Sequence, residues 1–206
     1  ATSTPTSASA TSARWIARGY SLALRPHLNE GPKLDRIQKK TGAVSPSVKG
    51  FISYAHEDHM ALKAVQKHMA PFKHLFGLKF WADKRINGGE FWSEKIAKAI
   101  DEASIHLLLA SPAFFQSDFI FDYEIPAIQK KFEQGDLVIP IIVSRCCWEA
   151  FLGPLQAVPT DATQRLLPVR DWSPQDNGFD ASRAQVQAAI EAHFKSKPTG
   201  LDWKRA

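Results

Sequence analysis

The sequence contains few cysteines and no long apolar run. The 206-residue chain contains two cysteines, the adjacent pair Cys146 and Cys147. Neighbouring cysteines rarely bridge each other, and a disulfide-stapled domain needs more of them, so we expect two reduced thiols in a cytoplasmic protein. No stretch of eighteen or more apolar residues occurs, so we expect no membrane partner.

Several signatures of cofactor chemistry and nucleophilic catalysis are also missing. The first apolar strand is followed by Ala55-His56-Glu57-Asp58 instead of a glycine-rich phosphate loop, which argues against a Rossmann dehydrogenase and a P-loop enzyme. No Gly-x-Ser-x-Gly elbow is present. The cluster His56–His59 has two interpretations, a metal site or a solvated loop in which Asp58 caps a helix. Because no distant cluster completes a coordination shell, we favour the solvated loop and expect no metal.

Positive charge is confined to one end of the chain. Residues 1–47 carry seven lysines or arginines against two acids, whereas residues 48–206 carry nineteen of each sign. A nucleic-acid-binding domain has a basic face on its folded body, so we expect no nucleic acid as a partner of this body. The basic leader, rich in Ala, Ser and Thr at its start, is expected to be largely disordered. Its residues 14–25 also resemble a transit peptide, but we favour a linker or docking segment.

Apolar segments with strand and helix periodicity alternate from residue 48 onward. Helical segments of ten to fifteen residues separate the strands, which predicts an α/β domain with a flavodoxin-like, doubly wound, five-stranded parallel sheet and helices on both faces. Pro140 conflicts with a central strand, because proline removes a ladder hydrogen bond. We expect the domain to span residues 48–195, followed by a tail at 196–206. The predicted strands are Val48–Tyr54, Leu78–Ala82, Ile105–Ala110, Leu137–Val143 and Leu166–Val169.

One acid, Glu124, is predicted to lie at the ligand-binding edge of this sheet. Ligands bind outside the carboxyl ends of parallel strands, and the loop after the third strand leads to Glu124. Proline is tolerated in the first turn of a helix, so Pro126 predicts a helix that starts near Asp122, with Glu124 in its first turn. An ionised carboxylate there is either a catalytic group or a simple complement to the helix dipole. The residues alone leave both open.

Five motifs, in order, resemble the Toll/interleukin-1 receptor (TIR) domain family over about residues 48–195. Each motif is weak alone, and their order makes the resemblance specific. The family often has Trp four residues before the catalytic glutamate; here Ile120 stands there, and Phe121 is the expected aromatic substitute. The motifs are Phe51-Ile52-Ser53-Tyr54, Trp81-Ala82-Asp83 with Ile86–Glu90, Leu107–Phe114 with Ser117-Asp118-Phe119 and Glu124, Val138–Ile142, and Cys147-Trp148 with Leu152, Leu155-Gln156-Ala157 and Pro159, the last like the bacterial branch.

This resemblance implies an activity and a set of site residues. Many TIR domains cleave NAD+ between nicotinamide and ribose, which would make Glu124 catalytic and NAD+ a substrate, with no cofactor and a role in bacterial immunity or cell-death signalling. Other members are scaffolds, so a non-catalytic module that recruits TIR domains remains the alternative. A sensor domain or partner protein is a further possible partner. The implied substrate-binding residues are Phe51, Tyr54, Trp81, Asp83 and Phe91. The implied loop for TIR–TIR self-association is Asp83, Lys84, Arg85, Ile86, Asn87, Gly88, Gly89 and Glu90.

Overall fold

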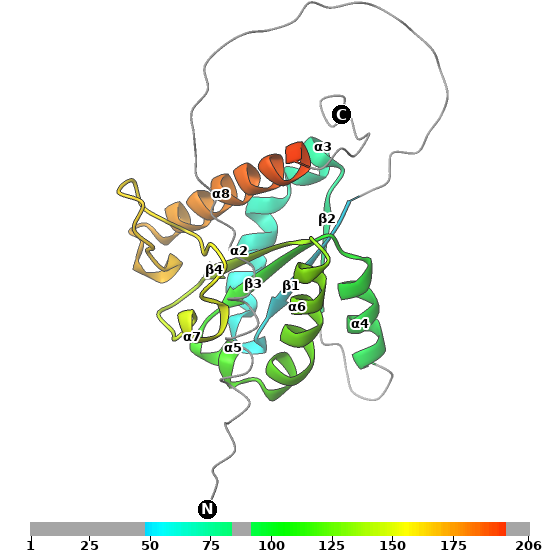
Figure 1. Ribbon diagram of the computed structural model, residues 1–206. Helices are drawn as coiled ribbons and strands as arrows, with labels where there is room; N and C mark the ends of the chain where they lie inside the picture. Colours follow the sequence, from blue (N-terminus) through cyan, green and yellow to red (C-terminus); the bar gives the residue numbers. More distant parts are fainter. Residues whose placement is uncertain (1–47, 84–91, 197–206) are drawn as a thin grey trace, which may run out of the picture.

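The computed structural model describes residues 48–83 and 92–196 (Figure 1). The leader at 1–47, Phe91, most of the expected assembly loop and the last ten residues therefore lie outside the described residues. The expected disorder of the leader and the boundaries of the domain stay predictions.

Four parallel strands form the sheet at the centre of the fold. The strands are β1 (Lys49–Tyr54), β2 (Lys79–Ala82), β3 (Ile105–Ala110) and β4 (Leu137–Ile142), in the order β2-β1-β3-β4. All six residues of β3 are buried, as expected for a strand covered on both faces. The predicted α/β class with a parallel sheet is confirmed.

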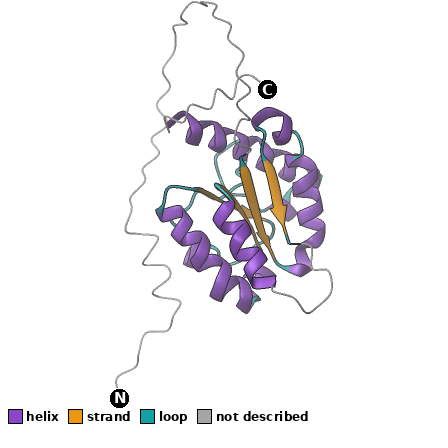
Figure 2. Ribbon diagram, turned by 90° about the vertical axis from the view of Figure 1, so that its right-hand side faces the viewer, coloured by secondary structure: helices purple, strands orange, loops and turns teal. Residues whose placement is uncertain are grey.

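Helices connect the strands and cover both faces of the sheet (Figure 2). On one face, α2 and α8 pack their apolar side chains against Ile52 and Leu107 of the sheet. On the other face, α4 and α6 pack against Phe51 and Leu108. The helices are α2 (His59–Met69), α3 (Phe72–Phe76), α4 (Trp92–Glu102), α5 (Pro112–Gln116), α6 (Ile125–Glu133), α7 (Glu149–Leu152) and α8 (Gln175–Ser196), with short 3-10 turns η1 (His56–Asp58) and η3 (Val169–Asp171) and a π-helical turn η2 (Ile120–Glu124).

The fifth strand that the sequence predicts at 166–169 does not form. Leu166 makes a single antiparallel bridge with Thr160, and Val169 begins η3. Pro168 precedes this turn, and a proline supplies no backbone N–H for a strand ladder. Beside β4 the sheet is instead extended by one parallel bridge, between Ile141 and Val158.

Pro140 is tolerated in β4 because its backbone N and O atoms point away from β3. Its carbonyl accepts a hydrogen bond from the Val158 N–H, at 2.9 Å, away from β3. The N and O atoms of one strand residue point to the same side, so the missing N–H of Pro140 costs no bond to β3. This is the edge position at which proline is tolerated.

The strand order reverses direction between β1 and β3. From β1 the chain moves to β2 on one side and then returns to β3 on the other. At such a switch point the loops that leave the carboxyl ends of the two strands diverge and open a crevice, which is where ligands bind in open α/β sheets. The loop after β1 and the segment after β3 therefore border the candidate site.

Candidate functional site

Glu124 occupies a π-helical turn in a helix that begins earlier than the sequence predicts. Helical backbone starts at Asp118 and continues through η2 into α6. The Ile125 N–H bonds to the Ile120 carbonyl, five residues back instead of four. This wider turn gives room for Pro126, whose ring would crowd a carbonyl in a regular helix. The expectation that Glu124 lies in the first turn of its helix is therefore wrong.

A hydrogen bond from the sheet holds the Glu124 carboxylate in place. The Ser53 hydroxyl on β1 donates to Glu124 Oε2, and the two side chains are 1% and 6% exposed. Side chains alternate along a strand, so Ser53 faces the same side of the sheet as Phe51, which packs among the side chains of α4 and α6. Strand β1 thus holds the carboxylate at a buried position, where water cannot replace the hydrogen bond from Ser53.

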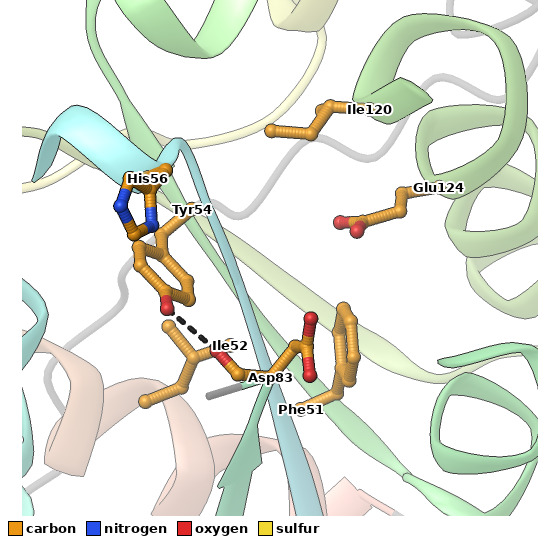
Figure 3. Close-up of a pocket in the computed structure, with 7 residues that line it drawn as sticks. All are labelled: Phe51, Ile52, Tyr54, His56, Asp83, Ile120 and Glu124. Carbon is orange, nitrogen blue, oxygen red and sulfur yellow. Dashed lines mark hydrogen bonds between the residues drawn. The ribbon is translucent and has the colours of Figure 1, made fainter. Parts of the chain in front are cut away.

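A small pocket that opens to solvent lies beside this carboxylate (Figure 3). The Tyr54 hydroxyl donates to the Asp83 carbonyl at 2.5 Å, which ties the end of β1 to the end of β2. Two carboxylates, Glu124 and Asp83, therefore border one pocket. Its lining residues are Phe51, Ile52, Tyr54, His56, Asp83, Ile120 and Glu124.

Four of the six sequence-predicted site residues meet in this pocket, namely Phe51, Tyr54, Asp83 and Glu124. Trp81 does not line the pocket. Its ring stacks on Phe51, with 5.6 Å between centroids and 16° between the planes. Trp81 supports the aromatic wall instead of lining the pocket. The remaining predicted residue, Phe91, lies outside the described residues.

Phe121 does not supply the expected aromatic wall. Its ring packs edge-on against Phe151, at 5.3 Å between centroids, and it does not line the pocket. Ile120 lines the pocket where the family often has Trp. The wall next to the acid is therefore aliphatic on the helix side and aromatic, through Phe51, on the strand side.

Asp58 has a different role from the predicted helix cap. It precedes α2, but its side chain makes no capping hydrogen bond. Its buried carboxylate accepts a hydrogen bond from the Ser111 hydroxyl and lies 3.5 Å from the Arg170 guanidinium. Ser111 in turn caps α5 by accepting from the Phe114 N–H, at 3.1 Å. Asp58 thus joins the loops that follow β1 and β3 at the edge of the sheet that carries the pocket.

Within residues 48–83 and 92–196, no three His, Cys, Asp or Glu side chains are arranged to hold a metal ion. No helix in these ranges is long and apolar enough to cross a membrane.

The set of predicted site residues lacked four residues of the site: Ile52, Ser53, His56 and Ile120. Ser53 could have been found from the two-residue alternation of β1, which puts it on the face of Phe51. His56 follows β1 directly and so belongs to a loop at the ligand-binding edge. The TIR resemblance pointed to position 120, but we expected Phe121 to take the place of the family's Trp, and Ile120 itself lines the pocket.

Two comparisons with known proteins agree with this architecture. The sequence model of the TIR domain family matches residues 51–188. An uncharacterized protein of Sinorhizobium fredii, y4lF, is 35% identical to this chain over 147 residues, which cover 70% of the chain. The matched segment spans 44% of that protein, so the chain corresponds to less than half of this relative. With the family match covering most of the folded body, the chain belongs to the TIR domain family.

Proposed function

We propose that this TIR domain is an NAD+ glycohydrolase that cleaves the bond between nicotinamide and ribose. The observation that carries the proposal is the buried Glu124 carboxylate, held by Ser53 at the edge of a pocket in an open α/β sheet. The TIR family includes NAD+-cleaving enzymes with a glutamate at this place in their motif. A role in bacterial immunity or cell-death signalling follows as part of the same proposal.

The chemistry requires a fixed negative charge close to the ribose. When the glycosidic bond breaks, its electron pair goes to the pyridinium nitrogen and neutral nicotinamide leaves. Positive charge then develops on the ribose as an oxocarbenium ion. The Glu124 carboxylate stabilises this charge, and does so more strongly in a pocket with little water than in bulk solvent.

Two nucleophiles can complete the reaction. Water adds to the ribose carbon, loses a proton and gives ADP-ribose. Attack by the adenine ring of the same molecule gives a cyclic isomer. The Asp83 carboxylate borders the same pocket and can accept hydrogen bonds from ribose hydroxyls.

The test is the substitution Glu124→Gln, with Asp122→Asn as the matched control. Asp122 lies in the same π-helical turn but is exposed and outside the pocket lining. We expect Glu124→Gln to lower the rate of nicotinamide release by at least about 10²–10³-fold, the cost of losing one preorganised electrostatic group, and Asp122→Asn to keep it. Circular dichroism checks the fold of both variants. NAD+ cleavage by Glu124→Gln at the wild-type rate would refute the role of Glu124.

The same assay tests the alternative, a non-catalytic scaffold. Wild-type protein is incubated with NAD+ over a hundredfold range of protein concentration, with and without a crowding agent, while light scattering follows assembly. Specific activity that rises with assembly supports an enzyme that is completed by neighbouring copies, since a partner that binds the active state raises its population. Absence of nicotinamide release from assembled protein would favour the scaffold.

A further inference from the structure

One side chain of the pocket remains without a role in the proposed reaction. His56 lies directly after β1 and lines the pocket together with Glu124 and Asp83. Among the described lining residues, His56 alone carries a side-chain nitrogen. An imidazole ring donates at least one N–H hydrogen bond whatever its charge state, so His56 can bind an acceptor-rich group that enters the pocket.

His56 is also uncommitted within the described residues. Its imidazole makes no hydrogen bond or ion pair in residues 48–83 and 92–196; its ring neighbour is His59, with 6.3 Å between centroids. Among the described residues of neighbouring loops, Arg170 pairs with Asp58 at 3.5 Å and Arg145 pairs with Asp171 at 2.8 Å. Tyr54 donates its hydroxyl proton to the Asp83 carbonyl.

A substrate with a phosphate group needs such a donor in this pocket. Glu124 and Asp83 repel a phosphate, while they favour a cationic ring and sugar hydroxyls. In Figure 3, His56 lies beside Tyr54, on the side of the pocket away from Phe51, and the Glu124 carboxylate points into the space between. A substrate whose ribose is held at Glu124 has the His56 imidazole in the same pocket as a hydrogen-bond donor for the phosphate on that ribose.

We propose that His56 recognises the phosphate next to the nicotinamide ribose, and so selects nucleotides over nucleosides at this site. The inference rests on the proposed function for its choice of substrate. It assigns His56 to substrate binding, separate from the bond-breaking step at Glu124. Substituting His56 therefore raises KM for phosphate-bearing substrates and leaves kcat nearly unchanged.

The kinetic test uses three substrates that share the scissile bond: nicotinamide riboside, nicotinamide mononucleotide and NAD+, which carry no phosphate, one phosphate and a pyrophosphate. We expect His56→Ala to raise KM about tenfold for the mononucleotide and NAD+, equivalent to about 1.4 kcal/mol for one charge-assisted hydrogen bond. KM for the riboside stays the same. The matched control is His59→Ala, an exposed histidine that does not line the pocket. An equal change for all three substrates, or no change, would overturn the assignment.

A binding measurement separates this inference from the proposed function. Wild-type protein with isotope-labelled histidine is titrated with ADP-ribose, which carries the pyrophosphate but no nicotinamide, and with adenosine, which carries no phosphate. We expect ADP-ribose, but not adenosine, to shift the His56 ring signals in NMR spectra. If ADP-ribose shifts these signals and NAD+ is not cleaved, the recognition site stands and the enzyme proposal fails. If NAD+ is cleaved and His56→Ala changes no KM, the recognition site fails alone.

Discussion

Removing the Ser53 hydroxyl is the most direct test of how this site is built. The substitution Ser53→Ala deletes one donor to Glu124 and leaves the backbone of β1 unchanged. With Ser53 1% and Glu124 6% exposed, water cannot replace the lost bond. The value for a buried hydrogen bond to a charged group therefore applies, about 1.5–3 kcal/mol, in place of the smaller value for an exposed pair.

This loss is large enough to appear in both stability and activity. For a domain of about 150 residues, 1 kcal/mol shifts the melting temperature by about 2–4 °C, so we expect Ser53→Ala to melt about 3–12 °C lower. Without the Ser53 bond the carboxylate is also held less firmly in the geometry that faces the ribose, and a misplacement of this kind costs up to about 10²-fold in rate. Calorimetry and nicotinamide release measure the two effects.

A second serine provides the control. The Ser144 hydroxyl is also buried, but it has no hydrogen-bond partner within the described residues. Ser144→Ala should therefore not lower the unfolding free energy, because it removes a buried hydroxyl that makes no hydrogen bond, and it should leave the activity intact. A Ser53→Ala variant that melts and reacts like Ser144→Ala would refute the reasoning that the bond from the sheet positions Glu124.

Two further predictions concern groups away from the pocket. Burial raises the pKa of the Asp136 carboxyl, but the His106 ring, 3.5 Å away, and the Lys131 ammonium, 3.4 Å away, outweigh it and hold this pKa below its usual range. A carboxyl whose pKa is lowered in the folded state stabilises the protein at pH values above its unfolded-state pKa of about 3.9, and this stability is lost as pH falls through the folded-state pKa. Asp136→Asn should therefore have a lower unfolding free energy than wild type in urea at pH 7, and the difference should shrink as the pH is lowered. Burial raises the pKa of the Cys146 thiol to about 11, whereas Cys147 is exposed, so iodoacetamide at pH 8 should label Cys147 first, as read by mass spectrometry of peptides; equal labelling rates would contradict this.

The sequence predicted the sheet well where the signal was local. Ile105–Ala110 is strand β3 to the residue, because a short apolar run between polar segments is typical of a strand covered on both faces. The prediction failed at Leu166–Val169, where an apolar run of similar length adjoins Pro168. Proline and the neighbouring 3-10 turn decide that region, and apolar content alone does not reveal them.

The candidate site was predictable in its members but not in its geometry. The alternation of strands and helices gave the edge of the sheet at which ligands bind, and the TIR resemblance gave Tyr54 and Asp83, which line one pocket. The helix that carries Glu124 could not be placed from Pro126, since a π-helical turn accommodates proline deep in a helix. A turn of this kind has no reliable local sequence signal, so the contact between Glu124 and Ser53 became visible only in the structure.

This geometry bears on the simplest alternative for Glu124, that it only complements a helix N-terminus. A carboxylate in that role lies in the first turn, near solvent, and accepts hydrogen bonds from free backbone N–H groups. Glu124 makes no such capping bond, lies more than one turn inside the helix and is buried against β1. Burying a carboxylate costs free energy that an exposed capping group does not incur, and the Ser53 bond offsets part of this cost. A buried acid kept at the ligand-binding edge of a sheet, with its desolvation offset by one donor from a neighbouring strand, is the arrangement expected of a functional group.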